Sequence, residues 1–246
     1  GLKSRFNHFE DNVDFDFVQD NSDIGDFDVN QIRLDVDDFT NQLFAETYLF
    51  KDFRFCLGLE QNDINASTAT IDNDLTNTEE ETVIQDSNLL STYGYLDYDS
   101  LDDKFFPTKG VFFSGDFHLY FNDLNNSGIN EFSIAKGRVG YVTTPINKVT
   151  TRFSSELGFR IGEEDVSSLN FFLGGYGNKT INNFRPFYGY DFFSLSANSY
   201  IKGMIEIDYN FYTQNHIILS ANYANVQDDI LSTGEWFSSP EFSGYA

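Results

Sequence analysis

Apolar and polar residues alternate over long stretches of this sequence, and that alternation restricts its fold more than any other feature. In 111–122 every odd position is apolar or glycine, whereas most even positions are polar. The same period of two recurs in 31–37, 53–60, 149–162 and 201–212. A β-strand sends successive side chains to opposite faces, so each segment predicts a strand between an apolar and a polar environment. Helical spacing fits none of these segments.

The length of these segments bears on which β-fold they form. Several run for about 10–14 residues, compared with about 5–6 for an average soluble strand and about 9–11 for a tilted strand that crosses a bilayer. The connections between them alternate between short and long, as in outer-membrane barrels. Alternation alone also fits a soluble β-sandwich. The strand length, the connections and the aromatic load of 28 Phe and 14 Tyr favour a membrane barrel.

The charge balance argues against nucleic acid as a partner. The chain has 39 acidic and 15 basic residues, a net charge of −24, which repels a phosphate backbone. The acids gather in Glu10–Asp38 and Asn62–Asn88, which we predict to be solvated loops. Binding of divalent cations by these loops is the alternative, although no acidic spacing of the EF-hand type supports it.

Nothing in the sequence predicts catalysis, a metal site or a cofactor. The Gly-x-Ser-x-Gly nucleophile elbow of a hydrolase does not occur. His8, His118 and His216 are isolated, without the spacing of metal ligands, and Cys56 is the only cysteine. We therefore expect this chain to be no enzyme, with any hydrolase activity in another domain.

The number of strands and the end of the sequence predict an incomplete barrel. We count about eleven strands, and the last begins near Phe242 and stops at Ala246. Bacterial barrels usually have an even number of strands and no free edge, because an unpaired backbone group in lipid costs several kcal/mol. We expect one barrel domain over 1–246, truncated at its C-terminus and also at its N-terminus.

Two segments carry a family likeness. In the first, Asp99-Ser-Leu-Asp-Asp103 is followed by Phe106-Pro-Thr-Lys-Gly110 and a long alternating strand. This resembles a strand–turn–strand unit of the BamA/TamA-type surface-antigen barrel superfamily of bacterial outer membranes. The resemblance implies a periplasmic turn that contains Asp103, Pro107 and Gly110. Pro107 fixes its own φ angle, and Gly110 permits an unusual turn conformation.

In the second, Phe171-Phe-Leu-Gly-Gly175 and Asn182-Asn-Phe-Arg-Pro-Phe-Tyr-Gly-Tyr190 precede another long strand. They resemble the superfamily's long loop, which folds back into the barrel lumen. The tip of that loop would be formed by Arg185, Tyr188, Gly189 and Tyr190. The sequence departs from the family pattern here, because Tyr188 stands where an arginine is expected and Arg185 lies three residues earlier.

The form of this second segment, together with Thr233-Gly-Glu-Trp236, looks most like the barrel that follows a patatin-like phospholipase domain. The resemblance runs from about Phe39 onward. It implies an all-β, antiparallel transmembrane barrel of sixteen strands, with the final two missing here, in the bacterial outer membrane. The implied partners are outer-membrane lipid and a fused or associated patatin-like lipid acyl hydrolase, which the barrel would anchor or translocate.

Two other functions stay open. A BamA-like factor would insert other outer-membrane proteins through a weak lateral seam, and POTRA repeats upstream would indicate it, whereas an upstream patatin domain would indicate the hydrolase anchor. A soluble all-β binding protein with acidic loops is the third reading. Independence from detergent would distinguish it.

Parity along the strands assigns residues to the lumen or to the lipid. Glu156, Glu206 and Asp208 fall on the polar rows and are predicted to point into the lumen. If its loop enters the lumen, Arg185 should pair with at least one of them, because an enclosed unpaired cation is costly. A solvent-facing Arg185 is the alternative. The predicted lipid-facing residues are Phe113, Phe117, Leu157, Ile205 and Ile207.

Overall fold

The computed structural model describes residues 1–14, 31–50, 52–71, 80–125, 130–162, 166, 169–176, 183–191, 194–212, 215–237 and 241–246. Ten strands form the main sheet: β1 (Leu2–Asp14), β2 (Gln31–Leu49), β3 (Phe53–Ile71), β4 (Glu80–Asp99), β5 (Gly110–Asp123), β6 (Phe132–Ile146), β7 (Val149–Ile161), β11 (Ser199–Tyr212), β12 (Asn215–Gln227) and β13 (Glu241–Tyr245). The remaining elements are β8 (Phe171–Leu173), β9 (Phe184–Arg185), β10 (Leu195–Ala197) and the helix α1 (Ile230–Thr233). Within these ranges, no helix has the length and apolar character needed to cross a bilayer.

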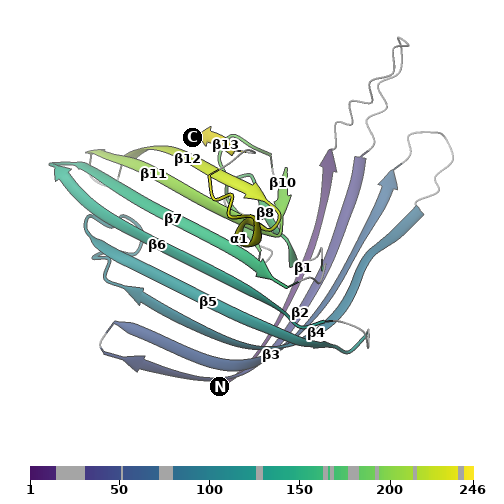
Figure 1. Ribbon diagram of the computed structural model, residues 1–246. Helices are drawn as coiled ribbons and strands as arrows, with labels where there is room; N and C mark the ends of the chain where they lie inside the picture. Colours follow the sequence, from purple (N-terminus) through teal and green to yellow (C-terminus); the bar gives the residue numbers. More distant parts are fainter. Residues whose placement is uncertain are drawn as a thin grey trace, which may run out of the picture.

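The main sheet is antiparallel throughout and follows chain order, except that β7 pairs with β11 across a long connection. The sheet curves strongly, and β8 and β10 lie against it near β12 and β13 (Figure 1). β8, β9 and β10 form a separate small sheet within the β7–β11 connection. The predicted all-β antiparallel barrel is confirmed as an incomplete barrel. Its sheet has ten strands among the described residues, instead of the expected eleven.

The acidic stretches depart from expectation. We predicted a solvated loop over Asn62–Asn88, but β3 and β4 continue through most of it, paired from Asn62 opposite Leu89 to Thr70 opposite Glu80. Within Glu10–Asp38, β1 continues to Asp14, whereas β2 begins at Gln31, as the alternation over 31–37 predicts. Pairing between strands satisfies the backbone hydrogen-bonding groups whatever the polarity of the side chains, so acidic composition alone is a poor guide to loops.

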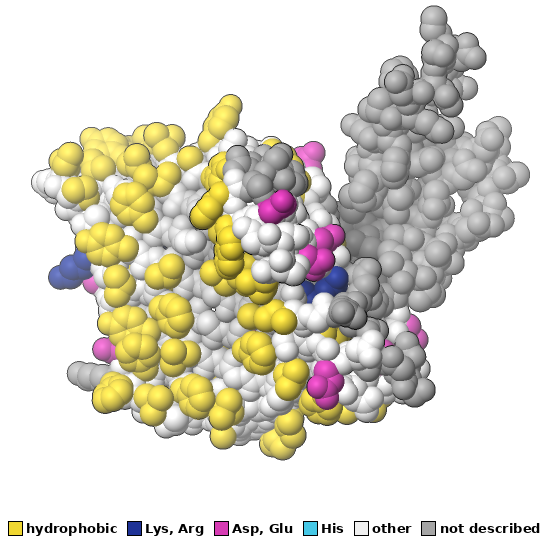
Figure 2. Space-filling view, viewed as in Figure 1, with side chains coloured by type: hydrophobic (Ala, Val, Ile, Leu, Met, Phe, Trp, Pro, Cys, Tyr) yellow, Lys and Arg dark blue, Asp and Glu magenta, His cyan; other side chains and the backbone are white. Residues whose placement is uncertain are grey.

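The two faces of the main sheet meet different surroundings. On the outer face, Phe113, Phe117, Ile205 and Ile207 are 38–46% exposed, and Leu157 is half-buried. Figure 2 shows hydrophobic side chains spread over this face, with few charged ones among them. Soluble monomers rarely leave so extended an apolar surface uncovered. These side chains do not meet in a dry interior between two sheets, as a sandwich would require.

The outer face is covered at one place. The side chain of Asn225 on β12 donates hydrogen bonds to the carbonyl oxygens of Glu235 (2.9 Å) and Trp236 (3.1 Å). The Trp236 ring then meets Phe159 of β7 edge-on, with 5.6 Å between ring centroids. Phe159 belongs to the outward row but is buried for this reason.

The buried apolar core lies on the inner face, under the connection between β7 and β11. Phe171 and Leu173 of β8 and Phe187 are fully buried there. They pack with Tyr200 of β11 and with Ala224 of β12. The core therefore joins the small sheet to the inner wall instead of joining two walls to each other.

Gly158 of β7 provides the space for this packing. A Cβ atom there would lie 2.6 Å from Phe171 Cζ and 2.5 Å from Tyr200 Cε1, and both rings are almost completely buried. We expect Gly158→Ala to lower the free energy of unfolding by about 1–3 kcal/mol, as overpacking does. The control is Gly203→Ala on β11, where a Cβ meets no atom within 4 Å. Urea unfolding in lipid vesicles, followed by Trp236 fluorescence, would measure both; equal losses would contradict the expectation.

Candidate functional site: the inner face and its docked loop

A band of opposite charges crosses the inner face from β3 to β12. The separations between charged groups are 3.1 Å for Arg54–Asp97, 3.2 Å for Lys136–Asp116, 3.1 Å for Arg138–Glu156, 3.3 Å for Lys202–Glu156 and 3.1 Å for Arg152–Glu206. Histidine rings lie beside other carboxylates of the band, at 3.6 Å for His118–Glu60, 3.4 Å for His118–Asp116 and 2.8 Å for His216–Asp208. Several pairs stand directly opposite each other on neighbouring strands, so the strand register itself creates them. Such a polar inner wall is what a transmembrane barrel has.

Glu156 is the centre of this band. Arg138 on β6 and Lys202 on β11 flank it in register, and its side chain is buried. A third cation comes from the β7–β11 connection, where Arg185 Nε lies 4.0 Å from Glu156 Oε2. Arg185 Nε also donates a hydrogen bond to the Tyr200 hydroxyl (3.0 Å). One carboxylate therefore ties two strands to the inserted connection.

The other two acidic residues that we predicted as partners of Arg185 pair with other side chains. Glu206 pairs with Arg152 at 3.1 Å, and Asp208 pairs with His216 at 2.8 Å. Both are inner-face residues of β11.

The tip of the connection is seated on the last two strands of the sheet. Asn222 of β12 accepts a hydrogen bond from Tyr188 N (2.7 Å), and its own side-chain amide donates to Tyr188 O (3.3 Å). A Cβ on Gly244 of β13 would lie only 1.6 Å from that carbonyl oxygen, so this contact requires glycine. The Tyr190 ring meets Phe242 of β13 edge-on at 5.7 Å. Tyr188, Gly189 and Tyr190 thus dock against β12 and β13.

A polar cavity of about 450 Å³ remains between the docked connection and the inner wall. Its cationic lining residues are Lys136, Arg138, Arg152, Arg185 and Lys202, and its anionic ones are Asp116, Glu156 and Glu206. The cavity is locally positive although the whole chain carries −24. Among the described residues, no group of three or more His, Cys, Asp or Glu side chains could hold a metal ion.

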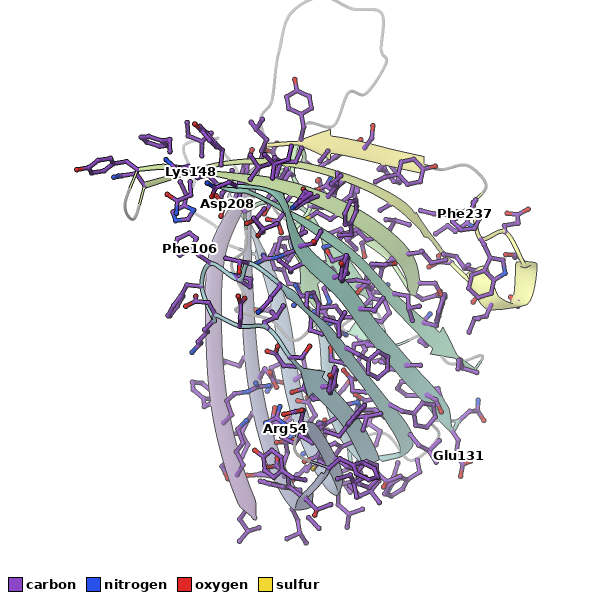
Figure 3. The ribbon with its side chains drawn as sticks, turned by 90° about the vertical axis from the view of Figure 1, so that its left-hand side faces the viewer. Arg54, Phe106, Glu131, Lys148, Asp208 and Phe237 are labelled. Carbon is purple, nitrogen blue, oxygen red and sulfur yellow. The ribbon has the colours of Figure 1, made fainter. Side chains whose placement is uncertain are left out.

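The predicted turn near Pro107 is longer than expected. It comprises all of Ser100–Lys109, which we call the strap, and Gly110 is already the first residue of β5. Asp103 Oδ1 accepts hydrogen bonds from the amides of Phe105 and Phe106, both at 2.8 Å. Pro107 is buried, and Gly110, with a φ of +128°, begins β5. Figure 3 shows Phe106 of the strap close to Asp208 of β11.

This wall, its polar inner face and its inserted connection can be compared with known proteins. The sequence matches the OMP85 superfamily over residues 1–246. The chain belongs to the OMP85 superfamily. No curated protein matches it. Among solved structures, BamA from Haemophilus ducreyi, crystallised without POTRA domains 1–3, is similar with a TM-score of 0.56 and 12% identity, over 100% of this chain and 55% of that one.

These comparisons confirm the superfamily that the two sequence segments indicated. At 12% identity the likeness to BamA concerns the fold alone. The OMP85 chain covers little more than half of the BamA chain that it matches.

Asp102 of this OMP85 barrel stabilises the strap through its charge. Hydrogen bonds from the Thr108 hydroxyl (2.5 Å) and amide (2.8 Å), and from the Lys109 amide (3.1 Å), lower its pKa from 3.8 to about 2. A lowered pKa favours the folded turn above pH 3.8, and this contribution is lost as the pH falls through about 2. We expect the Thr108 and Lys109 amides to be protected at pH 4, relative to intrinsic exchange at the same pH, and to lose this protection towards pH 2. Asp102→Asn should show little protection at both values; strong protection in that variant would contradict the assignment.

Several residues of the OMP85 inner face were not singled out from the sequence. Parity along its strand could have placed Arg138 on the inner face, but only the register of β6 and β7 puts it directly opposite Glu156. Asn222 and Gly244 carry no sequence signal of their own. Their roles arise only when residues 188–190 dock against them.

Proposed function

We propose that this chain is a bacterial outer-membrane β-barrel that anchors or translocates a patatin-like lipid acyl hydrolase. The observation that carries the membrane part is the uncovered apolar outer face, with Phe113, Phe117, Ile205 and Ile207 on it, opposite a charged inner face. Strands β5, β6, β7, β11 and β12 have 13–15 residues, enough to cross a bilayer at about 9–11 residues each. Outer-membrane lipid would then surround the wall.

The inserted connection supports an anchor over a passive diffusion pore. Its tip is fixed to β12 and β13 by Asn222, and Arg185 is held between Glu156 and Tyr200. Lys202 Nζ adds a hydrogen bond to the carbonyl oxygen of Pro186 (3.0 Å). A segment attached at so many points narrows the lumen, so passage through it would require the segment to move. In this proposal Arg185, Tyr188, Gly189 and Tyr190 form the lumen loop tip.

The link to a patatin-like hydrolase rests on sequence. The run from Asn182 to Tyr190 and the later Thr233-Gly-Glu-Trp236 segment support it. The position of Arg185, three residues before the usual place of the tip arginine, also distinguishes this chain from the assembly-factor pattern. The barrel itself would supply no catalytic group, and hydrolysis would belong to the partner domain.

Fractionation of cells that express the full-length protein tests this proposal. We expect the protein in the outer membrane, with acyl hydrolase activity towards a short-chain ester in the same fraction. Removing residues 1–246 should release that activity from the membrane. An outer-membrane protein without hydrolase activity would reject the patatin link while retaining the barrel. A protein that stays soluble without detergent would reject the barrel.

A BamA-like assembly factor is the second candidate, because the chain belongs to the OMP85 superfamily and shares a barrel fold with BamA. Its partners would be other outer-membrane proteins. Depletion of the full-length protein should then reduce the amounts of several unrelated outer-membrane barrels, whereas loss of a hydrolase anchor should leave them unchanged.

A further inference from the structure

The strap does not stay beside the two strands that it connects. It follows β4 and precedes β5, yet the Phe106 ring stacks on the ring of His216 at the start of β12, with centroids 4.0 Å apart and planes inclined by 16°. In the sheet order, β6, β7 and β11 lie between β5 and β12. The strap therefore spans the inner side of the sheet at the end where the short turns lie.

Two further contacts fix this position. The Thr144 hydroxyl, beside the β6–β7 turn, donates a hydrogen bond to Thr108 O (2.8 Å). Beneath Phe106 and Pro107, only about 50 Å³ of space is left against inner-face residues of four strands: Val142, Thr150, Arg152, Glu206, Asp208 and Ile218. The strap thus rests on β6, β7, β11 and β12 together.

The strap is also built to keep its shape. Asp102 accepts three hydrogen bonds from Thr108 and Lys109, and Asp103 accepts two from Phe105 and Phe106. Ser100 N donates to Val111 O (3.0 Å), which extends the ladder of β4 and β5 into its base. Because these hydrogen bonds hold the segment in one shape, we expect it to move as a unit about its base. Phe106 is the residue that contacts His216 of β12.

We propose that the strap closes the lumen at the short-turn end and that separation of Phe106 from His216 opens it. This rests on the proposed function, because it requires the chain to be a membrane-embedded barrel. The lumen is then closed twice, by the docked β7–β11 connection within it and by the strap across its mouth. Translocation would require both to move.

Conductance of the full-length protein in planar lipid bilayers tests the proposal. Phe106→Ala removes the stacked pair, and the time-averaged conductance should rise by about two- to tenfold, the range expected for the loss of one aromatic pair. The matched control is Phe105→Ala. Phe105 also borders the small space beneath the strap, but it is 75% exposed and its ring lies against Lys104, so its removal leaves the stacked pair of Phe106 and His216 in place. We expect it to conduct like the wild type.

The rate of cysteine labelling tests the same closure independently of conductance. In a Cys56→Ala background, Val142→Cys places a thiol under the strap, at a position that is 1% exposed. Its reaction with a membrane-impermeant maleimide should accelerate when Phe106→Ala is added, and not when Phe105→Ala is added. Heat-modifiable migration of each variant in gels would verify folding.

The outcomes separate the two proposals. Unchanged conductance and labelling in a folded, inserted Phe106→Ala variant would overturn the role of the strap, as would equal increases for both phenylalanines. A wild-type protein that does not float with lipid vesicles would overturn the proposed function itself.

Discussion

Replacing Glu156 by glutamine is expected to lower the free energy of unfolding by about 3–5 kcal/mol, the cost of removing one partner from a buried ion pair. The carboxylate is buried beside Arg138, Lys202 and Arg185. Glutamine keeps the shape of the side chain but removes the negative charge that lies within 4.0 Å of all three cations. These cations then repel one another, and Arg185 loses the charged group that holds its loop to the wall.

Urea unfolding in lipid vesicles measures this loss, and protease cleavage within 162–198 reports release of the loop. Glu206→Gln is the matched control, because its carboxylate on the neighbouring strand pairs with one cation, Arg152, among the described residues. The control should lose less stability and keep its loop protected. If both variants behaved alike, the convergence of three cations on Glu156 would have no energetic consequence.

A lysine at position 117 is expected to cost about 2–4 kcal/mol in folding into a bilayer, as charges do near the middle of a lipid-facing wall. Phe117 is 46% exposed on the outer face of β5, with no charged partner across the strands. Lysine there would place an ammonium group in hydrocarbon.

Ser114→Lys on the same strand is the control. Ser114 points to the inner face, where it lines the polar cavity between Asp97 of β4 and Arg138 of β6. A lysine there stays among polar groups, and its attraction to Asp97 offsets its repulsion from Arg138, so its effect should be smaller than that of the lysine at 117. Equilibrium folding into vesicles measures both variants. Equal tolerance of the two lysines would show that the faces are assigned the wrong way round.

The wall of the barrel could be predicted from the sequence because it depends on a local rule. Alternation fixes which side chains share a face, so Phe117 and Ser114 could be placed on opposite sides without knowledge of the pairing. The inner position of Glu156 follows in the same way. The register of the strands then brings Arg138 and Lys202 to it, and that register depends on the turns and on the neighbouring strands.

The inserted segments could not be derived in this way. The seat of Tyr188 on Asn222 and the stacking of Phe106 on His216 join residues far apart in the chain, and no periodic pattern encodes either contact. Acidic composition misled the prediction over 62–88, because β3 and β4 satisfy each other's backbone groups beyond the point where β5 ends. The resemblance to a family predicted the inserted loop, whereas the alternation of apolar and polar residues predicted the strands.

The height of the wall is uneven, and this has a consequence for access. The last pair between β4 and β5 is Leu89 with Asp123, so residues 80–88 of β4, with their β3 partners, continue past β5 (Figure 1). At roughly 3.3 Å per residue the extension measures about 30 Å. In a cell envelope it would rise above the lipid as a screen on one flank of the opening. A macromolecule approaching from outside would meet this screen on the β3–β4 flank, whereas the neighbouring β5 ends lower in the wall.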